Sequence, residues 1–196
     1  MMNRREALKR VAVLTGGAIS PSVVSAVLSG RRAGGEKWTP KIVTTEQNNL
    51  ITTITELIIP DTDTPGAKAA KVNEFVDLML ADWFAPGEKT HFMNGVADLD
   101  SRAQKQHSAA FVKCTTEEQT AILKELEKEG LAHEDNNPPQ SQTDVLKPFF
   151  SQMKELTLIG YYTSEIGASQ ELKYLRSASN YKGCVPFEKI GRAWSD

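Results

Sequence analysis

Three carboxylates are among the residues of this sequence whose type could carry chemistry. Asp61, Asp63 and Glu165 are side chains of the kind that serve in general acid/base catalysis or bind hard cations. The spacing of Asp61 and Asp63 lacks the further ligands and the glycine of a calcium-binding loop, so capping and turn formation is the better interpretation of both. A stand-alone enzyme or metal-binding protein that uses these three carboxylates remains an alternative hypothesis.

The histidines and cysteines form no ligand motif. His91, His107 and His133 are far apart, and neither Cys114 nor Cys184 has a second Cys or His at the short spacing of a zinc, haem or iron–sulfur site. The sequence also lacks a phosphate-binding glycine loop, a serine nucleophile elbow and a flavin fingerprint. We therefore predict no catalytic, cofactor-binding or metal-binding residues in this chain.

Composition describes an ordinary soluble globular protein. The 196 residues are enough for one domain with a single core. Lys and Arg total 23 against 25 Asp and Glu, and this net charge of -2 argues against nucleic-acid binding. With 40% hydrophobic and 24% charged residues, the chain is too apolar to be disordered.

The N-terminus has the organisation of an export signal, in which a basic segment precedes an apolar run of small residues, 11–28. Its basic part resembles the twin-arginine motif through Arg4, Arg5, Leu8 and Lys9. We assign residues 1–30 to this signal and 31–43, which contain Gly and Pro, to a linker. The sequence thus predicts a periplasmic protein, where Cys114 and Cys184 can form one disulfide bond.

The remaining residues, 44–196, are predicted to form an all-α domain. Apolar residues recur at helical spacing in five segments, which lie within 44–59, 72–85, 92–103, 115–129 and 145–160. Two of these segments begin with a capping-box pattern, at Thr44 and at Thr115. No run alternates with period two. We expect a compact bundle of about five to six helices.

Two further segments, 58–67 and 158–167, contain more than helix patterning. The first combines Asp and Thr side chains, which cap backbone N–H groups, with Pro and Gly, which fix a rigid turn. The second has two tyrosines suited to interfaces. The candidate assembly residues are Asp61, Thr62, Asp63, Thr64, Pro65, Gly66, Tyr161, Tyr162, Thr163, Ser164 and Glu165.

Both segments resemble the marker motifs of the gluconate 2-dehydrogenase subunit 3 family. The first motif matches over residues 62–67, Thr-Asp-Thr-Pro-Gly-Ala, and the second over 163–167, Thr-Ser-Glu-Ile-Gly. The two matches occur in the family's order, about a hundred residues apart. Together with Leu172-Lys173-Tyr174 and the stretch 183–187, the resemblance covers roughly residues 44–187.

The resemblance implies a non-catalytic, helical small subunit bound to a large flavoprotein of the glucose–methanol–choline type. The large subunit would hold FAD and oxidise the sugar, and a multihaem cytochrome c with its own haem would accept the electrons. The twin-arginine translocase would carry the folded pair into the periplasm on the small subunit's signal, and the complex or an uncleaved leader could then hold it at the membrane. A periplasmic binding protein without such a partner is a third hypothesis.

Overall fold

The computed structural model describes residues 38–136, 146–174 and 184–195. The export-signal residues Arg4, Arg5, Leu8 and Lys9 lie outside these ranges, so the signal stays a prediction. By its internal contacts the chain divides into two units, Met1–Thr39 and Pro40–Asp196. The second unit contains the helical body.

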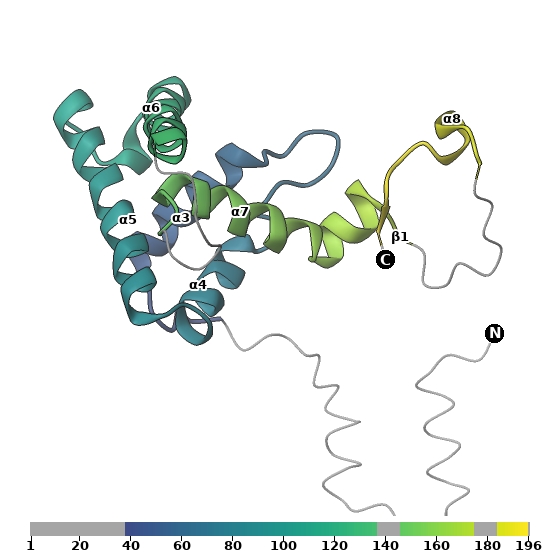
Figure 1. Cartoon of the computed structure of the whole chain (residues 1–196), viewed down its shortest axis with the longest axis horizontal. Coiled ribbons are helices and arrows are strands. Elements are labelled where there is room, and N and C mark those ends of the chain that lie inside the picture. Colours follow the sequence, from purple (N-terminus) through teal and green to yellow (C-terminus); the bar gives the residue numbers. More distant parts are fainter. Residues whose placement is uncertain (1–37, 137–145, 175–183, 196) are drawn as a thin grey trace, which may run out of the picture. The chain divides into compact units, whose positions relative to one another are not determined.

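The body is all-α, as predicted, and its order is shown in Figure 1. The long helices are α3 (Thr45–Ile58), α4 (Val72–Asp82), α5 (Pro86–His107), α6 (Thr116–Asn136) and α7 (Phe149–Tyr162). Shorter elements are the 3-10 turn η1 (Phe111–Lys113), the π-helical turn η2 (Gly167–Glu171), strand β1 (Lys173–Tyr174), helix α8 (Phe187–Ile190) and strand β2 (Trp194–Ser195).

Both predicted capping boxes are confirmed. The Thr44 hydroxyl accepts from the backbone N–H of Gln47 at 3.2 Å, while the Gln47 side chain accepts from the Thr44 N–H at 2.9 Å. Thr115 and Glu118 make the same reciprocal pair before α6, at 3.3 and 2.8 Å. These bonds satisfy N–H groups that have no partner inside the helix, and so they fix where α3 and α6 begin.

Two helix ends differ from the predicted segments. The fourth segment ends at 129, before Gly130, but α6 continues to Asn136. At Gly130 the helix meets Pro148, at the start of α7, and a Cβ on this glycine would lie 3.3 Å from the Pro148 Cβ. Helix α4 ends at Asp82, before the end of the second predicted segment at 85. Pro86 occupies the first turn of α5, where its missing N–H costs nothing.

The core lies where the other long helices meet α7. Helix α7 packs against α3, α4, α5 and α6, and its buried side chains include Phe149, Met153 and Leu156. Two glycines permit this approach. A Cβ on Gly160 would lie 2.7 Å from the Phe75 ring of α4, and one on Gly95 of α5 would lie 2.2 Å from the Phe149 ring. Any larger residue at either site would push the helices apart.

The C-terminal segment returns to the end of the body. Strand β1 pairs in parallel with β2, so Lys173 lies opposite Trp194, and the Lys173 ammonium lies 4.7 Å from the centre of the Trp194 ring. This two-residue ladder adds to the all-α body without changing its class. None of the described helices is both long and apolar enough to cross a membrane.

A buried carboxylate fixes the chain where it enters the body. The Asp77 side chain on α4, which is 1% exposed, accepts the backbone N–H groups of Lys41 at 2.7 Å, Ile42 at 3.0 Å and Val43 at 3.1 Å. The residues before α3 have no helical partners for these N–H groups. The three hydrogen bonds replace those that water would make with the buried carboxylate and with the three N–H groups.

We predict that Asp77→Ala lowers the free energy of unfolding by about 2–3 kcal/mol, because it leaves the N–H groups of 41–43 without an acceptor. Urea denaturation followed by circular dichroism measures the change. The matched control is Asp82→Ala, on the same helix, whose exposed carboxylate lies 3.2 Å from the Lys41 ammonium. This substitution should lower the free energy of unfolding by less than about 1 kcal/mol. Equal losses in both variants would contradict the assigned role.

Candidate interaction site

The loop from Ile59 to Ala67 is closed by a glutamate that precedes it. One carboxylate oxygen of Glu56, in the last turn of α3, accepts the Asp61 N–H at 3.1 Å, and the other accepts the Lys68 N–H at 2.7 Å. The Ala67 N–H also donates to the Ile59 carbonyl at 2.9 Å. The loop is therefore tied at both of its ends. Sequence reasoning missed Glu56, which falls inside a regular helical pattern.

Gly66 is required by the shape of this loop. A Cβ at Gly66 would lie 2.6 Å from the Asp61 nitrogen and 2.7 Å from both the Pro60 carbonyl carbon and a Glu56 carboxylate oxygen. Backbone atoms cannot move aside as a flexible side chain can. Close packing of the loop therefore explains why the first motif has a glycine at this position.

The loop is braced on the end of α7. The Tyr161 hydroxyl donates to the Pro65 carbonyl at 2.8 Å, and the Thr64 hydroxyl donates to the Glu171 carboxylate at 2.5 Å. Tyr161 is 1% exposed, and burial raises the pKa of its phenol. It therefore stays protonated and remains a donor. These two bonds join residues that are about a hundred positions apart.

The second motif forms the turn that ends α7. The Ser164 hydroxyl donates to the Tyr161 carbonyl at 2.6 Å and accepts the Gly167 N–H at 3.0 Å. A Cβ on Gly167 would lie 2.0 Å from the Tyr161 carbonyl oxygen, so only glycine fits. The π-helical turn η2 follows at once and carries Glu171, the partner of Thr64. Sequence reasoning missed Glu171.

The candidate assembly residues separate into an inner and an outer group. The inner group, buried or half-buried, consists of Thr64, Pro65, Gly66, Tyr161 and Ser164. The outer group, exposed, consists of Asp61, Thr62, Asp63, Tyr162, Thr163 and Glu165. The inner residues brace the two segments on each other. The outer residues are left to face solvent or another molecule.

The acid/base and metal hypotheses gain no support from the described residues. Asp61 and Glu165 are exposed, and the Asp63 carboxylate accepts the neighbouring Thr62 hydroxyl at 3.1 Å. In the described ranges, no three His, Cys, Asp or Glu side chains are placed to hold a metal ion. Two of the histidines make ordinary contacts: His91 with the Lys147 carbonyl at 3.1 Å, and His107 with Glu118 at 3.2 Å.

Cys114 and Cys184, the two residues of the possible disulfide, are both free in the structure. Cys114 is half-buried between η1 and α6, and its thiol donates to the Ala110 carbonyl at 3.6 Å. Cys184 is exposed in the segment before α8. Burial raises the pKa of the Cys114 thiol, which lowers the fraction of reactive thiolate.

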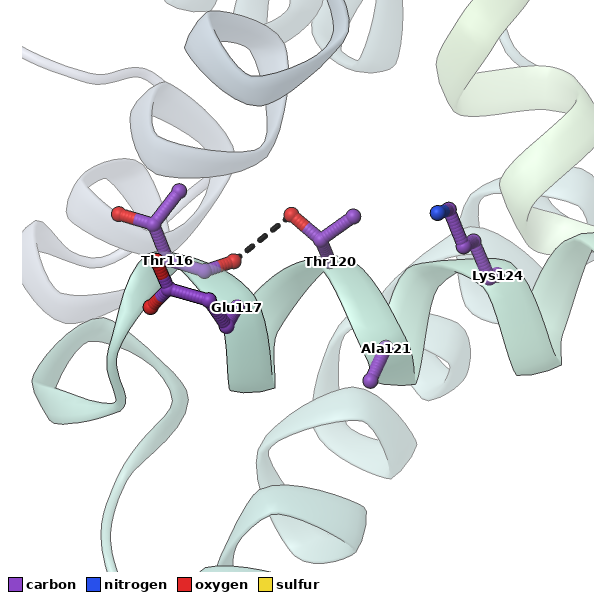
Figure 2. A pocket seen from close by; sticks show the side chains of 5 residues that line it. All are labelled: Thr116, Glu117, Thr120, Ala121 and Lys124. Atoms are coloured by element: carbon purple, nitrogen blue, oxygen red, sulfur yellow. Dashed lines mark hydrogen bonds between the residues drawn. The ribbon is translucent and has the colours of Figure 1, made fainter.

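A hollow of about 380 Å³ on α6 offers no alternative site. Figure 2 shows its lining, which is Thr116, Glu117, Thr120, Ala121 and Lys124. All five residues belong to successive turns of one helix, and the Thr120 hydroxyl is bonded to the Thr116 carbonyl at 2.7 Å. With no opposing wall, such a hollow cannot enclose a small molecule.

We predict that Tyr161→Phe lowers the free energy of unfolding by about 1 kcal/mol, because the Pro65 carbonyl loses its donor. Tyr162→Phe is the matched control, since this neighbouring ring is half-exposed; it should change stability by less than about 0.3 kcal/mol. Denaturation in urea gives both values. An equal effect of the two substitutions would show that the brace does not depend on the Tyr161 hydroxyl.

Comparison with known proteins bears on the same segments. No curated protein and no solved structure matches the chain. The family model of gluconate 2-dehydrogenase subunit 3 matches residues 45–178, which is more than half of the chain and includes both the loop and the turn after α7. The chain therefore belongs to the gluconate 2-dehydrogenase subunit 3 family.

Proposed function

We propose that this chain is the small, non-catalytic subunit of a periplasmic flavin-dependent sugar dehydrogenase of the gluconate or glucose type. Its partner is a large subunit of the glucose–methanol–choline type, which holds FAD and oxidises the sugar. A multihaem cytochrome c, with haem of its own, accepts the electrons. The small subunit supplies the export signal and serves the large subunit as escort and scaffold.

One observation carries the proposal: residues in and directly before the family's two motifs are used to brace a loop on a helix. Tyr161, just before the second motif, and Thr64, in the first, bond to groups of the same chain, and Gly66 allows the close packing of the loop. Catalysis would instead need a base, nucleophile or ligand set converging on an enclosed pocket. A scaffold needs a rigid surface, and that is what such bonds provide.

The export role rests on the N-terminal sequence. Arg4 and Arg5 precede an apolar run, and the twin-arginine route carries folded proteins. A large subunit without its own signal can therefore cross only when it is already bound to this chain. We propose a periplasmic location, with membrane association through the complex or through an uncleaved leader.

We predict that changing Arg4 and Arg5 together to Lys leaves both subunits in the cytoplasm, because an ammonium does not replace the planar guanidinium. Cell fractionation with dehydrogenase assays locates the activity. The matched control is Arg10→Lys, which makes the same substitution later in the basic segment and should leave export unchanged. Normal periplasmic activity in the double variant would refute the export role.

We also predict that Asp63→Asn combined with Glu165→Gln leaves turnover per flavin within about twofold of the original, because the barrier is lowered in the large subunit. The substitution keeps shape and removes both charges. The isolated complex, assayed at equal flavin content, gives the turnover number. A loss of tenfold or more in intact complex would favour the enzyme hypothesis that uses these carboxylates.

A further inference from the structure

Helix α7 is buried on one side only. Its inner face meets α3, α4, α5 and α6. The opposite face carries the exposed residues of the helix, which are Glu155, Leu158, Ile159 and Tyr162. On a surface helix such a face is expected to be polar.

The chemistry of this outer face changes along the helix. In the first half of the helix the charges are satisfied within the chain, since Lys154 pairs with Glu127 of α6, and Glu155 with Lys147, which precedes α7, both at 2.7 Å. In its second half Leu158 and Ile159 are each 46% exposed, and Tyr162 is 39% exposed. Single exposed apolar residues are common, but these three occupy two successive turns of one face.

This apolar patch is linked to the braced loop through the buried Tyr161. The Tyr162 ring packs edge-on against the Tyr161 ring, with centroids 5.3 Å apart, and the Tyr161 hydroxyl holds Pro65. Exposed carboxylates lie on the two segments that the brace joins, with Asp61 and Asp63 on the loop and Glu165 on the turn after α7. We call Leu158, Ile159 and Tyr162, with these three carboxylates, the α7 face.

The carboxylates of the α7 face are not neutralised within the described residues. The ion pairs found there join other acidic groups, and Asp61, Asp63 and Glu165 take part in none of them. An apolar centre with a charged margin is the usual anatomy of a protein–protein interface. The fitting partner is therefore an apolar surface bordered by Lys or Arg.

A second copy of this chain fits the α7 face poorly. In a two-fold contact each face meets the same face, so the acidic margins of the two copies would lie close together. Like charges placed opposite each other disfavour association. Complementary charge requires a different protein.

The α7 face is also rigid before anything binds. The bond from Tyr161 to Pro65, the bond from Thr64 to Glu171 and the tight turn at Gly167 fix the loop relative to the helix. A preorganised surface loses little conformational entropy on binding.

We infer that the α7 face is the surface on which the large flavoprotein subunit docks, through an apolar hollow bordered by basic side chains. This inference rests on the proposed function and adds to it the place of contact. Leu158, Ile159 and Tyr162 supply the buried centre. Asp61, Asp63 and Glu165 steer the approach and set its dependence on salt.

The test is a titration of purified large subunit with this chain, followed by calorimetry. Leu158→Gln combined with Ile159→Gln should weaken binding about thirtyfold or more, since both side chains are central. Gln favours helix, so the fold should be retained, and circular dichroism checks this. The matched control is Leu131→Gln. Leu131 is 55% exposed and follows Gly130, whose neighbours Pro148 and Ser151 lie at the opposite end of α7.

A second variant tests the acidic margin. Asp61→Asn combined with Asp63→Asn should slow association severalfold at low salt and flatten its salt dependence, with little effect on dissociation. Stopped-flow mixing measures both rates. An unchanged salt dependence of association would show that Asp61 and Asp63 do not belong to the interface.

The outcomes separate the two ideas. If the unaltered chain does not bind the large subunit, the proposed function fails. If it binds and the Leu158/Ile159 variant binds equally well, only the docking face is refuted. Light scattering of the isolated chain completes the test: a dimer that this variant dissociates would assign the face to a second copy and overturn the inference.

Discussion

The close approach of other helices to α7 is the constraint on which this fold depends. At its two ends this helix is reached through glycines, where a Cβ on Gly95 would meet the Phe149 ring and one on Gly160 would meet the Phe75 ring. Such close packing fixes the directions of the helix axes. These directions decide which side of α7 faces outwards. The inner brace and the outer apolar patch are two consequences of one placement.

Much of the fold is predictable because its signals are local. The capping boxes at Thr44 and Thr115 each need only four consecutive residues, and the apolar spacing within 92–103 correctly predicts a helix, α5, whose buried side chains include Phe92, Val96 and Leu99. The errors come from contacts between distant residues. A glycine often marks a helix end, and only the contact with Pro148 shows the other reason for a glycine at position 130. Nothing near Asp77 in the sequence indicates that its partners are the N–H groups of 41–43.

In the candidate site, too, the local features were predictable and the contacts between distant residues were not. The content of the two motifs predicts a rigid loop and a tyrosine-rich turn, and the structure joins them. The sequence could not tell which tyrosine is internal, because neighbouring helix positions differ by about 100° and only the packing of α7 sets the phase. Glu56 and Glu171 escaped notice for a related reason. Each is an ordinary helical glutamate until a loop from another part of the chain reaches it.

The clamp made by Asp77 has a mechanical consequence. The chain enters the body through Lys41, Ile42 and Val43, and all three are tied to one side chain in the middle of α4. A pull on the chain ahead of residue 40 therefore loads these bonds together and passes into α4, instead of peeling α3 from its first turn. The body can therefore be pulled by its N-terminal end while its helices stay packed against one another.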